Sequence, residues 1–349
     1  MVDRQDGGKG RGGHGLLGGL GDVTTIAYHE TVNDLQDPAW WGPGPFATRD
    51  WFALLETRRT RPLYATAREG SSRVLLPLNR GPRGLESLAN WYAFTWQPLL
   101  SGPAAPRLLA NLARDLRTNH ARIDFAGVPA ERDVTGILVR AFREGGWRVF
   151  SEAADTNHIL RPAGRPFADY LATRPGRLRT TLKRKAKAVQ TQIATTFSNE
   201  DWQAFEEIYA VSWKPAEGDP DFLRRFAIAQ SRKGHFLFGL ARHDGEPVAA
   251  QFWTIENGTA FIHKLAHRQD ATRLSPGSVL TAALFEHALD AAGVDCVDFG
   301  TGNDAYKADW MEETRTRHRI TCLDPRTPRT WPALARRIAR KLVPAARGG

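Results

Sequence analysis

The chain has 349 residues, of which 42% are hydrophobic and 25% are charged, and its formal net charge is +10 at pH 7. This length leaves room for about two domains with cores of their own, and the composition is typical of a soluble globular protein. Two cysteines, Cys296 and Cys322, argue against a disulfide framework or a thiolate metal site, so we expect no bound metal. No apolar run approaches the roughly 20 residues of a membrane-spanning helix, and the N-terminus lacks the pattern of a secretory signal. We therefore expect a cytoplasmic location.

The first 172 residues divide into a tail and a mixed domain. Residues 1–22 are rich in glycine and poor in apolar side chains, which predicts disorder. Residues 23–172 combine apolar patterns of strand and helix period, which predicts an N-terminal α/β or α+β domain. The expected strands are 62–67, 73–78, 121–125 and 147–150, and the expected helices are 48–58, 106–118 and 132–144.

Two basic segments carry much of the positive charge. Residues 173–194 are expected to form a basic connecting helix, mainly over 175–192, because seven cations and no acid occur between positions 174 and 190. Residues 326–349 are similarly basic, and this expected C-terminal helix has an apolar stripe formed by Trp331, Leu334, Ile338 and Leu342. Each segment is consistent with contact to nucleic acid, anionic lipid or an anionic substrate, or simply with a solvated or docked helix face.

Residues 195–325 have the clearer topology. The segments 236–242 and 247–256 are apolar and rich in aromatic residues, and the His-Asp-Gly-Glu turn between them predicts a hairpin. A second turn leads into a third antiparallel strand, 260–267. The remaining expected elements are helices at 199–211 and 276–292 and a strand at 296–299. We predict a second α/β (α+β) domain with a mixed, mostly antiparallel sheet flanked by helices.

The start of the later helix in this domain has the features of an anion site. Ser275 is expected to be the N-cap, with Pro276 at the first helical position. Free amides at Gly277, Ser278 and Val279, together with the positive end of the helix dipole, would favour a phosphate or pyrophosphate. We therefore predict that a phosphorylated cofactor binds at Ser275, Gly277, Ser278 and Val279. A purely structural helix start is the alternative.

Several features of the sequence, taken together, resemble one known family. They are Ser275-Pro276-Gly277 before the helix, the run DFGTGNDAYKADW from Asp298 to Trp310 after it, Leu75-Leu76-Pro77-Leu78, Asn90-Trp91-Tyr92, and Leu182-Lys183-Arg184-Lys185. Over nearly all of 23–323 the chain resembles the GNAT-superfamily acyltransferases grouped with cellulose-biosynthesis acetyltransferase-like proteins. These are distant relatives of the peptidoglycan-bridge aminoacyltransferases.

The resemblance implies a tandem arrangement of two GNAT-like domains. The second would hold acetyl-CoA or another acyl-CoA as co-substrate, and the first, degenerate, would help to form the acceptor cleft. Residues 268–274 lack the closely spaced glycines of the usual GNAT phosphate loop. An aminoacyl-tRNA donor, as in the bridge-forming relatives, therefore stays open.

Acyl transfer requires removal of a proton from the attacking amine or hydroxyl and stabilisation of an oxyanion. His263, on the third strand, is a candidate base, and Asp298, at the end of the next strand, is another. Tyr306 is a candidate acid for the leaving thiolate. Each candidate also has a structural alternative. His263 could be a hydrogen-bonded or surface histidine, Asp298 could cap a turn, and Tyr306 could pack with its helix against the sheet. Strand alternation predicts a shared face for Phe261, His263, Leu265 and His267.

The candidate substrate-binding residues lie in two segments. They are Asn303, Lys307 and Trp310 after the last strand, and Lys183, Arg184 and Lys187 on the basic helix. Because strand ends in such sheets open toward a neighbouring domain, we expect the acceptor cleft between the two domains. Its expected borders on one side are Asp298, Asn303, Tyr306 and Lys307. The basic helix is expected to border the donor or acceptor cleft.

The leading hypothesis is a cytoplasmic N- or O-acyltransferase that moves an acyl group from acyl-CoA to an amine or hydroxyl, on a saccharide precursor in polysaccharide biosynthesis. One alternative is an aminoacyl-tRNA-dependent transferase acting on a cell-wall precursor, with nucleic acid as its partner. Another is a non-catalytic polysaccharide-assembly binding protein. The basic C-terminal helix would allow peripheral contact with a membrane.

Overall fold

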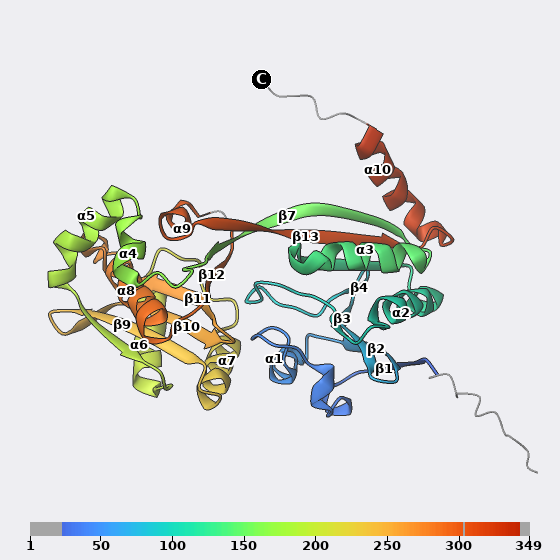
Figure 1. Cartoon of the computed structure of the whole chain (residues 1–349), viewed down its shortest axis with the longest axis horizontal. Coiled ribbons are helices and arrows are strands. Elements are labelled where there is room, and N and C mark those ends of the chain that lie inside the picture. Colours follow the sequence, from blue (N-terminus) through green and yellow to red (C-terminus); the bar gives the residue numbers. More distant parts are fainter. Residues whose placement is uncertain (1–22, 303, 343–349) are drawn as a thin grey trace, which may run out of the picture.

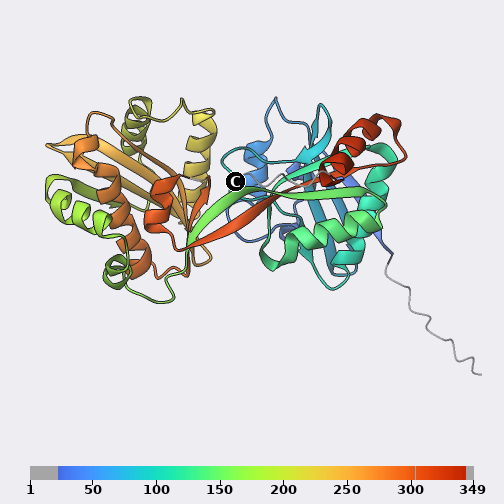
Figure 2. The same ribbon diagram turned by 90° about the horizontal axis from the view of Figure 1, so that it is seen from above.

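The structure of the chain is a computed structural model that describes residues 23–302 and 304–342, without the side chains of 340–342. The predicted disorder of residues 1–22 and the predicted role of Asn303 lie outside this part. Two mixed units lie next to each other and are joined by two long strands (Figure 1). Seen from above, the same two strands run between the units (Figure 2).

Thirteen strands of the described chain form one continuous sheet in the order β1-β2-β3-β4-β6-β13-β7-β12-β11-β10-β9-β8, with β5 paired to β3. Neighbouring strands are antiparallel except at β4–β6 and β11–β12. The strands are β1 (Thr25–His29), β2 (Pro62–Glu69), β3 (Ser72–Gly81), β4 (Gly84–Ser87), β5 (Leu99–Ser101), β6 (Arg122–Pro129), β7 (Arg148–Leu160), β8 (Gln190–Ala194), β9 (Phe236–His243), β10 (Glu246–Glu256), β11 (Thr259–His267), β12 (Cys296–Thr301) and β13 (Glu313–Leu323). The predicted α/β (α+β) class with a mostly antiparallel sheet is confirmed.

Helices cover both faces of this sheet. They are α1 (Arg49–Leu55), α2 (Ala105–Asn119), α3 (Val134–Glu144), α4 (Phe167–Ala172), α5 (Gly176–Lys185), α6 (Asn199–Ala210), α7 (Pro220–Arg232), α8 (Pro276–Glu286), α9 (Ala305–Trp310) and α10 (Trp331–Leu342). In the second unit, α6 and α7 contribute to one core and α4, α5 and α8 to the other. No helix in the described ranges is long and apolar enough to cross a bilayer.

The two units repeat one order of elements. Apart from the short strand β5, which lies between β4 and α2, the first runs β2-β3-β4-α2-β6-α3-β7, and the second runs β9-β10-β11-α8-β12-α9-β13. In each, three antiparallel strands precede a helix and then a strand that is parallel to the third one. The last strands are exchanged, because β7 pairs with β12 of the second unit and β13 pairs with β6 of the first. The units therefore share their sheet.

Some predicted elements differ from the structure. The hairpin of β9 and β10 is confirmed, but residues 190–194, predicted as helix, form the edge strand β8. The helix predicted to reach residue 292 leaves α-helical geometry after Glu286, where a π-helical segment, His287–Ala291, follows. The strand predicted at 147–150 is 13 residues long, and α7 and β13 were not predicted.

A bulge in β11 changes which side chains share a face. Lys264 pairs with Phe252 and Ile262 pairs with Trp253, so His263 is the extra residue. His263 therefore lies beside Phe252 in one core, whereas Leu265 belongs to the core on the other face. The predicted common face of His263 and Leu265 is wrong, because strand alternation cannot anticipate an inserted residue.

Candidate functional site

A cavity of about 500 Å³ opens beside the start of α8. We call it the α8 cavity, and its walls include Leu178 of α5, Trp213 of the α6–α7 loop, Leu265 and His267 of β11, Gly277 of α8, and Trp310 of α9. It lies where β11 and β12 separate, since their parallel pairing ends at Phe261 and Asp298. The divergence of these strands leaves room for a ligand between the end of β11 and α9.

The start of α8 offers fewer free amides than predicted. Ser275 is the residue before the helix, but it has left-handed backbone geometry (φ 52°) and its side chain does not cap the helix. The amides of Ser278 and Val279 donate to the Ser275 carbonyl at 3.1 and 3.2 Å. The prediction of three free amides is therefore wrong. Among the described residues, only the Gly277 amide of these three has no partner.

Buried polar groups hold Gly277 in place by hydrogen bonds to its carbonyl. Its carbonyl accepts hydrogen bonds from Thr281 Oγ1 at 2.8 Å and Gln251 Nε2 at 3.2 Å. The other end of the Gln251 amide accepts from Trp253 Nε1 at 2.9 Å. Satisfied buried networks of this kind restrict a segment to one position, so the Gly277 amide has a defined direction.

His267 lies next to Gly277 in the cavity wall and has a ring nitrogen without a partner in the described part of the chain. A Cβ at Gly277 would lie 3.2 Å from His267 Nδ1, which is closer than most Cβ contacts, so glycine is the residue that fits here without a shift of the ring. Nδ1 is buried and makes no hydrogen bond to any described residue. The ring stacks on Trp213 at 4.2 Å. Burial, together with the nearby Lys214, lowers the pKa of His267, which keeps the imidazole neutral at pH 7. An unpaired buried polar atom is costly unless a ligand or water bonds to it.

Three predicted residues meet at α9, with different environments. Tyr306 is 37% exposed, lines the α8 cavity and packs edge-on against Phe299. Burial of much of its ring raises the pKa of Tyr306 well above the ordinary value, so the phenol keeps its proton. Trp310 is buried at the cavity wall and stacks on Phe285 at 5.1 Å. Lys307 is buried below the cavity and donates to the Thr301 carbonyl, away from a ligand in the cavity.

His263 lies in an aromatic core. Its ring contacts Phe94 of the first unit and Phe226 and Phe252 of the second, and its Nε2 lies 2.8 Å from Thr254 Oγ1. Burial of its ring among these aromatic side chains, with Lys264 adding to the effect, lowers the pKa of His263 to about 3. These surroundings are those of a satisfied core histidine and do not support its predicted role as a base.

Asp298 is also occupied by structural contacts. It is 4% exposed, and its carboxylate accepts from Asn157 Nδ2 at 2.7 Å, from Arg315 at 2.8 Å and from the Gly300 amide at 2.8 Å. Asn157 is on β7 and Arg315 is on β13. Asp298 therefore ties β12 to the two exchanged strands. It does not lie with Tyr306 and Lys307 along one cleft, and this arrangement does not support a role as base.

The basic helix lies next to the α8 cavity. Leu178 of α5 is in the cavity wall, and Arg177 bonds Asp309 of α9 at 2.5 Å. The three residues with predicted substrate contacts are exposed; they are Lys183 and Arg184 on α5 and Lys187 in the following turn. They form a cationic surface at the end of α5 and the turn after it, while the start of α5 borders the cavity and is tied to α9 by Arg177.

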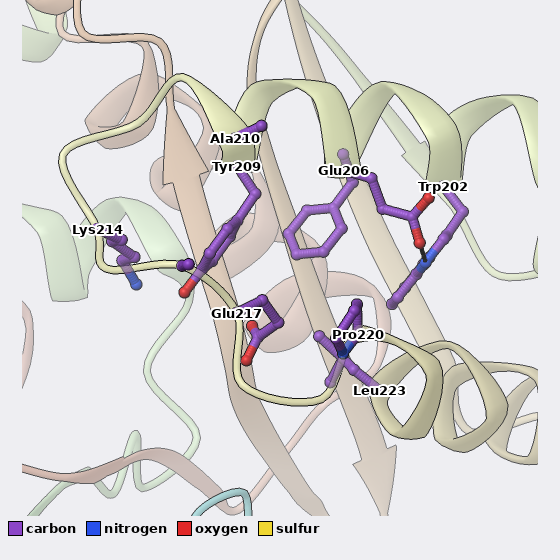
Figure 3. Close-up of a pocket in the computed structure, with 10 residues that line it drawn as sticks. Trp202, Glu206, Tyr209, Ala210, Lys214, Glu217, Pro220 and Leu223 are labelled. Carbon is purple, nitrogen blue, oxygen red and sulfur yellow. Dashed lines mark hydrogen bonds between the residues drawn. The ribbon is translucent and has the colours of Figure 1, made fainter.

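A second cavity, of about 390 Å³, lies between α6 and α7. We call it the α6–α7 cavity. Figure 3 shows Tyr209, Lys214 and Glu217 toward one end and Glu206, bonded to Trp202, toward the other. Trp213 lines the α8 cavity and the next residue, Lys214, lines this one, so the two cavities share a wall. Burial, with the neighbouring Lys264 adding to it, lowers the pKa of Lys214 to about 8.

A loop of the first unit reaches this region. Residues 88–98 separate β4 from β5, which pair with successive parts of β3, and the loop extends to the second unit. Tyr92 stacks on Phe222 of α7 at 5.2 Å and donates to Glu217 at 2.7 Å. Trp91 lies 4.2 Å from the ammonium of Lys264, which bonds Glu217 at 2.7 Å. The aromatic residues of the first unit thus complete the site of the second.

Comparison with protein families assigns the second unit. Residues 176–308 match the family described as "Acetyltransferase (GNAT) domain". The second unit is therefore similar to a GNAT acetyltransferase domain. This stretch includes all the residues that line the α6–α7 cavity and all but Asp309 and Trp310 of those that line the α8 cavity. The finer resemblance to the cellulose-biosynthesis group is not part of this match. Comparison with curated protein sequences gave no match.

Solved structures share the fold of the whole chain. FemX is 10% identical and has a TM-score of 0.61, with coverage of 88% of this chain and 99% of that one. The C-terminal domain (DUF2156) of an Agrobacterium fabrum protein is 15% identical, with a TM-score of 0.56 and coverage of 91% and 98%. A tandem GNAT protein from the clavulanic acid biosynthesis pathway is 15% identical, with a TM-score of 0.50 and coverage of 85% and 98%. At these identities the likeness shows the fold alone, and that fold is a tandem GNAT arrangement.

Sequence reasoning missed several residues of this site. Lys214 and Glu217 are in a loop without periodicity, and Lys264 follows the bulge that alternation did not reveal. One signal was available for His267, because it comes directly before the segment that leads to the Ser-Pro-Gly helix start. No group of three metal-ligating side chains is present in the described ranges.

Proposed function

We propose that this GNAT domain moves an acyl group from acyl-CoA to an amine or hydroxyl, with the donor in the α8 cavity. One observation carries the proposal: Gly277, whose amide is unpaired within the described ranges, and His267, whose Nδ1 is buried and likewise unpaired, lie next to each other in the cavity wall. A phosphate oxygen at this point would accept from the amide and from the Nδ1–H tautomer of the imidazole. The dipole of α8 favours the same negative charge.

The walls support a thioester between the diverging strands. With the phosphates at Gly277, the acyl end of the donor would extend toward Tyr306. In the transfer, the acceptor nitrogen or oxygen bonds to the carbonyl carbon, the C–S bond breaks, and the electron pair leaves with sulfur. Tyr306 keeps its proton at neutral pH and would donate it to the departing thiolate.

Aminoacyl transfer from tRNA is the second candidate, and one observation favours it. Lys183, Arg184 and Lys187 are exposed cations at the end of α5 and in the turn after it. Leu178, near the start of α5, lines the α8 cavity, so a donor with many phosphates could extend from the cavity along this helix. Binding of such a donor releases counterions, so its affinity would fall steeply with salt. Binding of CoA, which has few phosphates, would fall much less.

Titration with acetyl-CoA and with charged tRNA at several salt concentrations tests the two donors. We expect saturable binding of acetyl-CoA with a shallow salt dependence, and weakening on His267→Phe, which removes the ring nitrogens and keeps the stack on Trp213. Steep, salt-sensitive binding of tRNA without binding of acetyl-CoA would favour the second candidate. Binding of neither would overturn both.

A further inference from the structure

The lining of the α6–α7 cavity is mostly apolar, and the proposed binding of the donor does not use this cavity. The apolar part of its wall comes from both helices and the loop between them, through Trp202, Phe205, Ala210, Ala216, Pro220 and Leu223. Its volume of about 390 Å³ is within the range of small-molecule sites. Polar groups occur mainly at its ends, so a ligand of matching shape would have an apolar body and a polar tip.

The polar end of this cavity faces the donor. Lys214 and Trp213 are consecutive residues in the wall between the two cavities. Asp304, which lines the α8 cavity, is also close enough to Lys214 to affect its charge, so the side chain of Lys214 lies near both cavities. The bulge at His263 lies in the same strand as Lys264, whose ammonium approaches Lys214 closely enough to affect it. The reacting ends of two substrates, one in each cavity, would meet at this wall.

We propose that the α6–α7 cavity is the acceptor site, and that it selects an amine or hydroxyl attached to a compact apolar group rather than a saccharide. The inference rests on the proposed acyl transfer and specifies its acceptor. A sugar would leave its hydroxyls without partners against alanine, proline and leucine, which costs more than the aromatic contacts would return. An alkyl or aryl group gives up no hydrogen bonds in this cavity, and its removal from water favours binding.

Polar groups at the tip can orient the nucleophile. Glu217 and Tyr209 lie at the same end as Lys214, and Glu217 is fixed by Lys264 and by the Tyr92 hydroxyl of the first unit. The acceptor donates one hydrogen to the neutral amine of Lys214, its heteroatom bonds to the acyl carbon, and the thiolate leaves with the C–S electron pair. The proton on Lys214 then passes to solvent.

Ligand-observed NMR with 2-phenylethylamine and n-hexanol as probes, and glucosamine as the polar comparison, tests this acceptor site. We expect saturable binding of both apolar probes to the wild-type chain and weaker binding of glucosamine. Ala216→Trp and Ala210→Trp, which fill the cavity from two sides, should each weaken probe binding at least tenfold. Ala335→Trp is the matched control, because Ala335 is exposed on α10, outside both cavities.

Acetyl-CoA binding, measured on the same variants by calorimetry, separates this proposal from the proposed function. We expect it to be unchanged in all three variants. Unaltered probe binding in the two filled variants, tighter binding of glucosamine, or no saturable probe binding would overturn the acceptor assignment while leaving the donor site standing. Failure of acetyl-CoA to bind the wild-type chain would overturn the proposed donor instead.

Discussion

Gly277 is the residue at which a side chain would most directly interfere with the donor. A Cβ there would lie only 3.2 Å from His267 Nδ1, so that ring would have to shift by a few tenths of an ångström, and Gly277 lines the cavity. We predict that Gly277→Leu weakens acetyl-CoA binding at least about tenfold, the value of one charge-assisted hydrogen bond. Calorimetric titration measures the change.

Gly176→Leu is the matched control for Gly277→Leu. Gly176 is also in the first turn of a helix near the α8 cavity, but a Cβ there would meet only the end of Arg179 at 3.9 Å. This variant should bind acetyl-CoA like the wild type, and both variants should melt within a few degrees of it. Equal affinity in Gly277→Leu and the wild type would remove the donor from this position.

Lys214 should determine the pH dependence of transfer. Buried beside Lys264 and Lys307, with Asp304 and Glu217 acting in the opposite direction and His267 nearby, it has a pKa of about 8 instead of 10.5. Its neutral fraction grows as pH rises through that value, so kcat/KM should rise between about pH 7 and 9. Lys214→Gln should remove this limb and lower kcat/KM roughly 10²-fold or more.

Lys214→Arg distinguishes a base from a simple positive charge. Arginine keeps the charge but does not lose its proton in this pH range. We expect this variant to be as slow as Lys214→Gln at every pH. Recovery of the wild-type rate by arginine would mean that Lys214 acts only through its charge.

At the scale of elements, α5 is the segment whose charge should affect substrate capture. It packs on α8 through Leu178 and Leu182, which leaves its cations facing solvent near the cavity. Changing Lys183, Arg184 and Lys187 together to Ser should raise the KM for the anionic donor and flatten its salt dependence, because a surface charge acts over about 10 Å at 0.1 M salt.

A variant with three serines in the other basic segment controls for net charge. Arg326, Arg329 and Arg336 are exposed near or on α10, which lies on the first unit (Figure 1). Their replacement removes the same charge far from the α8 cavity and should leave KM unchanged. If both triple variants or neither changes KM, α5 has no special role in donor binding.

The elements that could be predicted from the sequence are those with a clear period. β9 and β10 alternate around a glycine turn, and α8 begins at a Ser-Pro-Gly sequence, so both were predictable. β13 was not, since its first half, Glu-Thr-Arg-Thr-Arg, is charged like a loop and becomes a strand only by pairing with β7. The same holds for the site. The start of α8 could be predicted from local sequence, but the bulge at His263 and the loop that contains Lys214 could not, because they depend on tertiary contacts.

At the scale of the whole molecule, the exchanged strands should make unfolding cooperative. β7 and β13 pair along their length, and Arg315 connects them to Asp298 of β12 and Glu131 of the first unit. We predict a single calorimetric transition, with equal calorimetric and van't Hoff enthalpies. Arg315→Ala should lower the melting temperature of that one transition. Two separate transitions in the wild-type chain would contradict shared folding of the units.

The exchange also separates two kinds of boundary that usually coincide. The stretch that matches the acetyltransferase family, residues 176–308, ends before β13 and begins after β7. Cut out at those borders, it would have lost the neighbour of β12 and would present an open strand edge, which promotes association between chains. The stretch that is similar to the family therefore does not correspond to a unit that could fold by itself. A fragment designed to isolate the chemistry would have to retain the first unit, which supplies both a strand of the sheet and the aromatic side chains that hold Glu217 and Lys264.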